Sequence, residues 1–139
     1  MGLFSIVYFC SWAFILKANE KLTTVEVALI CGVVYVMMIW SGKVYSKCYF
    51  NPALTLCDFY LKNISLNKAI YVVVSQLIGA YIGSLFIYYT VPQILLNQAA
   101  NEDAALGGVY FNVKYSFING IIVEALLSFV LAIIYFTSI

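Results

Sequence analysis

The sequence contains no histidine and no arginine, and charged residues make up only 9% of its 139 positions. Without histidine a common zinc ligand is missing, and the four cysteines include no C-x-x-C pair of the kind that forms a redox dithiol. A formal net charge of +1 leaves no basic surface for nucleic acid. We therefore expect no enzyme, no metal, no cofactor and no nucleic-acid partner.

Apolar residues take the place of the missing charges. They make up 65% of the chain, aromatic residues make up 17%, and the mean hydropathy is +1.00. A chain this apolar places much of its surface against lipid. Unpaired backbone polar groups are costly in hydrocarbon, so spanning segments must be helices or a closed barrel. The apolar runs lack the alternation of barrel strands, which predicts an all-α membrane protein whose main partner is the lipid bilayer.

Lysines and turn residues divide the chain into four long apolar segments, each interpreted as a transmembrane helix: residues 1–16, 24–42, 67–91 and 115–137. A helix needs about 20 residues, at a rise of about 1.5 Å each, to cross about 30 Å of hydrocarbon. The last three segments meet this length, and the first only approaches it. The connection Pro92–Lys114 is predicted to be a loop.

A shorter apolar segment, residues 52–61, lies between the second and third predicted spans. At this length it covers about 15 Å, half of the bilayer core, so it is either an interfacial helix or a re-entrant half-helix. Asn51 is suited to cap its start, and Pro52 to its first turn. A re-entrant half-helix would point its positive end and the Asn51 amide toward a lumen, which would repel cations and offer water a donor.

Lysines predict the orientation of the chain. Four lysines surround the short helix: Lys43, Lys47, Lys62 and Lys68. The other links between spans hold three lysines, together with acidic residues: Lys17, Lys21 and Lys114. Positive residues favour the cytoplasmic side. We therefore place the short helix and both chain ends on that side.

Small and polar residues inside the spans need explanations of their own. Ser75, Gly79 and Gly83 recur every four residues, a spacing that lets transmembrane helices approach closely and pack. Gln76 lies beside this stripe in an apolar run, where a buried amide must find partners. Glu124 is an ionisable residue deep in a predicted span, where it must pair or meet water. By itself it is compatible with proton coupling or with a structural role.

Four short segments, in this order along the chain, resemble signatures of the aquaporin, or major intrinsic protein, family. Gly2–Ile6 is similar to the G-T-F-x-L start, and Asn51-Pro52-Ala53 with Leu54-Thr55 is similar to the first NPA box with its following Val-Thr. Ser75–Ala80 is similar to the A-Q-x-x-G-A of the third helix, and Glu124–Ser128 to the E-x-x-x-T of the fourth. The resemblance covers about half of a family member. It implies four transmembrane helices and one re-entrant half-helix, and a passive channel for water or small uncharged solutes such as glycerol, tetrameric when full length.

The resemblance also implies roles for single residues. Gln76 and Glu124 would brace the re-entrant loop. Cys31 falls at a position of the family's aromatic/arginine constriction where water-selective members have an aromatic residue, so its small thiol would widen the filter; simple helix packing is the alternative. In the family, the residues just before the NPA box turn their backbone carbonyls toward the pore. The corresponding candidates for pore lining in this chain are Cys48, Tyr49 and Phe50.

Several features depart from the family pattern. Lys47 stands where many members carry glycine, and Tyr49 where many carry histidine. The chain has one NPA box, no second one and no arginine for the constriction. We therefore expect a fragment or degenerate product of such a channel. Two alternatives stay open: a small four-helix proton-coupled transporter using Glu124, and a non-transporting scaffold that packs through the Ser75–Gly83 stripe.

Overall fold

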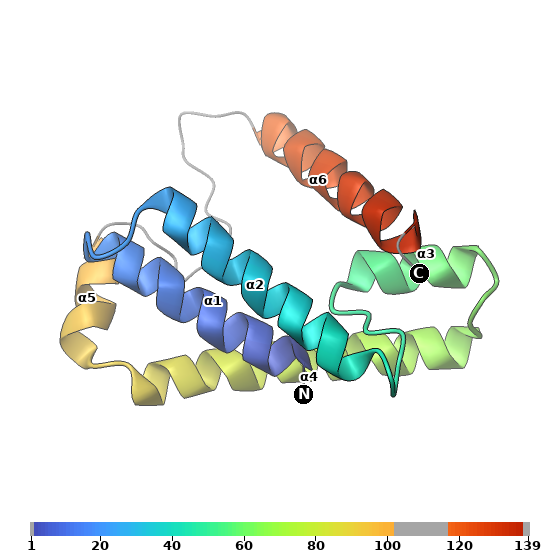
Figure 1. Ribbon diagram of the computed structural model, residues 1–139, viewed down its shortest axis with the longest axis horizontal. Coiled ribbons are helices and arrows are strands. Elements are labelled where there is room, and N and C mark those ends of the chain that lie inside the picture. Colours follow the sequence, from blue (N-terminus) through green and yellow to red (C-terminus); the bar gives the residue numbers. More distant parts are fainter. Residues whose placement is uncertain (1, 102–116, 138–139) are drawn as a thin grey trace.

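The computed structural model describes residues 2–101 and 117–137, and within these ranges every regular element is a helix (Figure 1). The predicted all-α class is confirmed. The helices are α1 (Gly2–Ala18), α2 (Thr24–Gly42), α3 (Pro52–Tyr60), α4 (Leu66–Thr90), α5 (Gln93–Asn101) and α6 (Phe117–Thr137).

Three of these helices, α2, α4 and α6, are long and apolar enough to cross a membrane. Helix α1 is also apolar but has 17 residues, which gives a length of about 26 Å. Helix α3 has nine residues and covers about 14 Å, too short for a span. Most large apolar side chains on the three long helices are exposed in the isolated chain, as expected of surfaces that face lipid or further protein.

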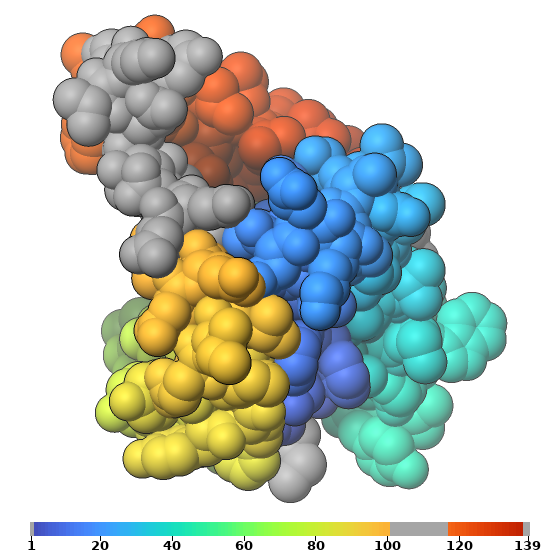
Figure 2. Space-filling model, turned by 90° about the vertical axis from the view of Figure 1, so that its left-hand side faces the viewer, coloured from blue at the N-terminus to red at the C-terminus, as the bar shows by residue number. Residues whose placement is uncertain are grey.

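The connection predicted as a loop from Pro92 onward instead begins with helix α5. The Pro92 carbonyl accepts hydrogen bonds from the N–H groups of Leu95 (3.0 Å) and Leu96 (3.2 Å), so the proline starts a helix rather than a loop. Buried residues of α5 form a cluster with the end of α1 and the end of α4: Leu96 and Ala99 with Ile15, Ala18, Ile87 and Val91. Figure 2 shows α5 lying across this end of the bundle. Residues 102–114 of the predicted loop lie outside the described ranges.

Helix α1 lies between α2 and α4, its two main neighbours (Figure 1). Two glycines of the predicted stripe, Gly79 and Gly83, face the start of α1. At Gly83 the backbones come so close that an added Cβ would lie 2.9 Å from the Phe4 carbonyl oxygen. Ser75 is exposed, and its hydroxyl donates to the Tyr71 carbonyl of its own helix (2.8 Å). The close α1–α4 approach therefore depends on Gly83, whereas Gly79 leaves room for a methyl group.

Helix α6 contacts the rest of the bundle mainly through α3. Its C-terminal end reaches the half-helix while its N-terminal end extends away from it (Figure 1). Tyr135 is the buried residue among the described positions of α6, and it clusters with Tyr49 and Leu54. In this cluster α3 and the loop that leads into it meet the last helix.

We expect Gly83→Ala to weaken the α1–α4 contact, because the new methyl carbon would lie 2.9 Å from the Phe4 carbonyl oxygen and 3.2 Å from Val7. Overpacking of this kind costs about 1–3 kcal/mol, so the temperature of unfolding in detergent should fall. Gly79→Ala is the matched control on the same helix. Its methyl carbon would meet the Phe4 nitrogen at 3.6 Å, an ordinary contact. Equal unfolding temperatures for the two variants would contradict this account.

Candidate functional site

Asn51 caps the start of α3 and thereby fixes where this short helix begins. Its backbone is extended (φ −138°, ψ 127°), and its side-chain oxygen accepts a hydrogen bond from the Ala53 N–H at 2.9 Å. Pro52 occupies the first helical turn, where its missing N–H leaves no gap. The Asn51 Nδ2 group makes no hydrogen bond to another described residue. The cap therefore uses the acceptor of this side chain and leaves its donor free.

Gln76 of α4 holds both the half-helix and the loop that leads into it. Its side chain is 5% exposed, and its Nε2 group donates to the Tyr49 carbonyl (2.5 Å) and to the Thr55 hydroxyl (3.1 Å). Thr55 is itself fully buried on α3. The Oε1 atom of Gln76 has no partner among the described residues. Through one amide group, α4 thus fixes the chain on both sides of Asn51.

Asp58 forms a second polar centre, on the opposite end of α3 from Asn51. Its carboxylate belongs to a residue that is 1% exposed, and it accepts hydrogen bonds from Lys47 Nζ (3.0 Å), Asn63 Nδ2 (2.7 Å) and the Tyr49 hydroxyl. The sequence interpretation did not single out Asp58. The available signal was that residues 43–68 contain four lysines and this one acidic residue.

The electrostatics of this centre follow from its donors. Burial acts to raise the pKa of the Asp58 carboxyl, but hydrogen bonds from Tyr49, Asn63 and Lys47, together with the Lys47 charge, outweigh it and hold the pKa below its ordinary value. Burial and the neighbouring carboxylate raise the pKa of the Tyr49 phenol. At neutral pH the carboxylate is charged and the phenol stays a hydrogen-bond donor.

The residues predicted to line a pore lie in the loop between α2 and α3. Cys48 and Tyr49 are buried, and Phe50 is half-buried with its ring against the Tyr35 ring. Cys48 has a left-handed backbone (φ 51°), and its thiol contacts the Ile39 carbonyl at 3.7 Å. The side chain of Cys48 is therefore a buried packing group, and that of Tyr49 is buried with its hydroxyl on Asp58. A lining role for their backbone carbonyls stays a prediction.

Two other predicted residues lie away from this loop. Cys31 is half-buried on α2 and lies near Cys10 of α1. Glu124 is exposed on the N-terminal half of α6 and makes no hydrogen bond or ion pair to another described residue. Because α6 reaches α3 only near its C-terminal end, Glu124 does not contact the loop. Roles in the constriction for Cys31 and in bracing for Glu124 stay predictions.

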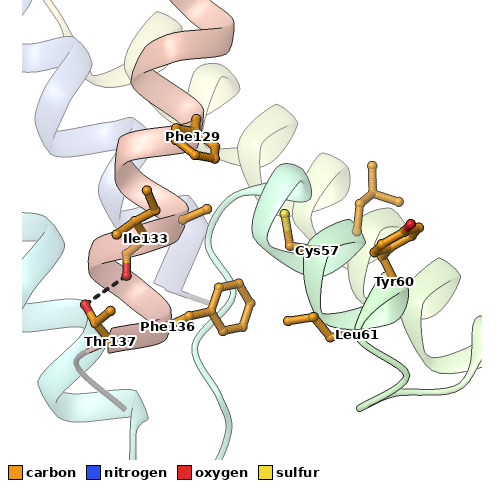
Figure 3. A pocket seen from close by; sticks show the side chains of 9 residues that line it. Cys57, Tyr60, Leu61, Phe129, Ile133, Phe136 and Thr137 are labelled. Carbon is orange, nitrogen blue, oxygen red and sulfur yellow. Dashed lines mark hydrogen bonds between the residues drawn. The ribbon is translucent and has the colours of Figure 1, made fainter.

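A groove of about 650 Å³ separates the exposed face of α3 from α6 (Figure 3). It is lined almost entirely by apolar side chains: Leu56, Cys57, Tyr60, Leu61, Phe129, Ala132, Ile133, Phe136 and Thr137. The Thr137 hydroxyl is already bonded to the Ile133 carbonyl at 2.9 Å. A groove with so few free donors and acceptors is poorly suited to water. The polar groups of α3 and its flanks lie instead toward α4 and the preceding loop.

The family model for the major intrinsic protein matches residues 1–139, from the first residue of the chain to the last. This chain belongs to the major intrinsic protein family. It is 28% identical over 102 residues to a probable aquaporin-5 of Gibberella zeae, an alignment that covers 73% of this chain and 17% of that protein. It is 24% identical over 117 residues to the glycerol uptake facilitator protein of Buchnera aphidicola, with 76% of this chain and 44% of that protein covered.

This major intrinsic protein sequence therefore spans less than half the length of these two relatives. No solved structure matches it significantly. The match confirms the resemblance found in the sequence motifs. Together with the three long apolar helices, it identifies the chain as an integral membrane protein.

We expect Gln76→Leu to destabilise this major intrinsic protein, because the Tyr49 carbonyl and the Thr55 hydroxyl would each lose a buried donor. A buried polar group left unpaired costs about 1–3 kcal/mol. The unfolding temperature in detergent should fall. Ser84→Ala on the same helix removes a hydroxyl that bonds only to the Ala80 carbonyl and should have little effect. An unchanged unfolding temperature for Gln76→Leu would exclude the bracing role.

Proposed function

We propose that this chain forms one half of a passive channel for water and small uncharged solutes such as glycerol. The observation that carries the proposal is the state of Asn51, whose acceptor is used in capping α3 while its donor is free. In a pore, that donor would bind the oxygen of a passing water or hydroxyl group. The names of the relatives, an aquaporin and a glycerol facilitator, support the same solute class.

In the proposed channel α3 is a re-entrant half-helix, and α1, α2, α4 and α6 are the spans. Support comes from the length of α3, about 14 Å, which reaches only half of the hydrocarbon core. A half-helix that starts at mid-membrane directs its positive dipole end into the pore, and this end repels cations without hindering neutral solutes. Buried hydrogen bonds from Gln76 would satisfy the backbone that enters the membrane with it.

The proposed pore needs a second half-helix. Pores of this family are built from two inverted halves, each contributing one such helix. The described residues supply one, and the chain covers 44% of the length of its glycerol facilitator relative. The proposed channel therefore includes a second half that these residues do not contain, and we propose that complete chains assemble as homo-oligomers, tetramers by family resemblance.

We expect Asn51→Ala to reduce solute flux more than it reduces the amount of folded protein. The substitution removes a helix cap, which costs about 1 kcal/mol, and also the free donor. The measurement is osmotic swelling of proteoliposomes containing the full chain, at equal protein. Ser65→Ala removes the cap of α4, where the hydroxyl accepts from the Lys68 N–H at 3.4 Å, and controls for lost capping. If Asn51→Ala conducts as well as the parent, the pore assignment is wrong.

The proposed passage of glycerol depends on Cys31 leaving the constriction wide. In that case Cys31→Phe should lower the ratio of glycerol to water permeability, because a ring narrows the pore. Cys31→Ser is the control, since it keeps the small size and should keep the ratio. Both permeabilities are measured on the same proteoliposomes. An unchanged ratio in Cys31→Phe would assign Cys31 to helix packing, with Cys10 as its neighbour.

A further inference from the structure

The Asp58 carboxylate is a buried charge that the channel function does not by itself require. A carboxylate removed from water is costly unless charged and hydrogen-bonding groups compensate it. Asp58 has three such donors, and each comes from outside α3: Lys47 and Tyr49 precede the half-helix, and Asn63 follows it. One carboxylate thus ties the incoming and outgoing chain to the same turn of α3.

Two of the three partners of Asp58, Lys47 and Tyr49, also have backbone carbonyls that accept hydrogen bonds from other helices. The Tyr135 hydroxyl of α6 donates to the Lys47 carbonyl, and Gln76 of α4 donates to the Tyr49 carbonyl. Lys47 and Tyr49 are therefore each fixed twice, by the side chain to Asp58 and by the main chain to a neighbouring helix. Between them lies Cys48 with its left-handed backbone.

Bonded and unbonded carbonyls alternate along residues 47–50, and this pattern determines which carbonyls are available to a solute. Within the described chain, the carbonyls of Cys48 and Phe50 accept no hydrogen bond, whereas those of Lys47 and Tyr49 each accept one. A backbone held at every second residue keeps a fixed direction for the free carbonyls between them. The exposed fraction of the Lys47 side chain, 51%, shows that the ion pair reaches the surface from the buried Asp58.

We propose that Asp58 is a positioning residue that sets the path of residues 47–51 and thereby the solute selectivity of the channel, with Lys47 as its counter-charge. The inference rests on the proposed function. It also gives one physical cause to two departures from the family pattern, since both Lys47 and Tyr49 are partners of this carboxylate. Asp58 touches no solute in this scheme; it acts through the loop.

The test compares Asp58→Asn, Lys47→Met and Lys43→Met in proteoliposomes containing the full chain. The readout is the ratio of glycerol to water permeability, which does not depend on how many channels are folded. A loop released from Asp58 opens more widely, so the ratio should rise severalfold in Asp58→Asn and in Lys47→Met. Lys43→Met removes an exposed lysine outside the Asp58 centre and should leave it unchanged. Asp58→Glu and Lys47→Arg, which keep the charges, should restore most of the parent ratio.

The inference is overturned if the permeability ratio stays at the parent value in both Asp58→Asn and Lys47→Met while the glycerol and water fluxes fall together. Asp58 would then have a structural role alone. If Asp58→Asn does not fold, the half-exposed Lys47 makes Lys47→Met the deciding variant.

A second measurement is independent of conduction. Amide hydrogen exchange of residues 47–51 should accelerate manyfold in Asp58→Asn or Lys47→Met, with α1 and α2 unchanged. Exchange that is unaltered, or that accelerates over the whole chain, would overturn the inference. A parent protein that conducts neither solute would refute the proposed function alone, and the exchange result would then decide whether Asp58 positions the loop.

Discussion

The fold of the half-helix region depends on satisfying backbone polar groups where no water reaches them. Backbone polar groups buried inside a protein are costly unless neighbouring groups supply their hydrogen bonds. Gln76 does this from α4, with one amide group shared between the Tyr49 carbonyl and the Thr55 hydroxyl. Its Nε2 bonds connect the loop, the half-helix and a long apolar helix, so the position of Asn51 follows from the position of α4.

The α1–α4 contact and the region around α3 are stabilised by different forces. Lipid removes most of the hydrophobic drive between helices, so α1 and α4 associate through close backbone approach at Gly83. Helix α3 is held by buried polar bonds, centred on Gln76 and Asp58. Asp58 lies in the last turns of α3, where the negative end of the helix dipole disfavours a carboxylate. The Lys47 charge offsets that cost as well as the cost of burial.

Local sequence signals predicted the features that depend on neighbouring residues. The start of α3 follows from Asn51 and Pro52, which act within one helical turn. The need for partners at Gln76 was also predictable from its apolar surroundings, but not their identity, because Tyr49 lies 27 residues away. The role of Asp58 was not predicted, because its donors come from the chain before and after α3 and meet the carboxylate only in the folded protein. Helix α5 was not predicted, because its apolar residues become buried only against the ends of α1 and α4 in the folded chain.

The side chains of α3 are divided between one buried polar face and one apolar face. Thr55 and Asp58 face the loop and α4, whereas the groove toward α6 is apolar. Because residues three apart share a face of a helix, the three-residue offset between Thr55 and Asp58 keeps these two groups on one face. The buried hydrogen bonds of α3 are therefore all made on the side away from the groove, and the groove side contributes apolar packing alone.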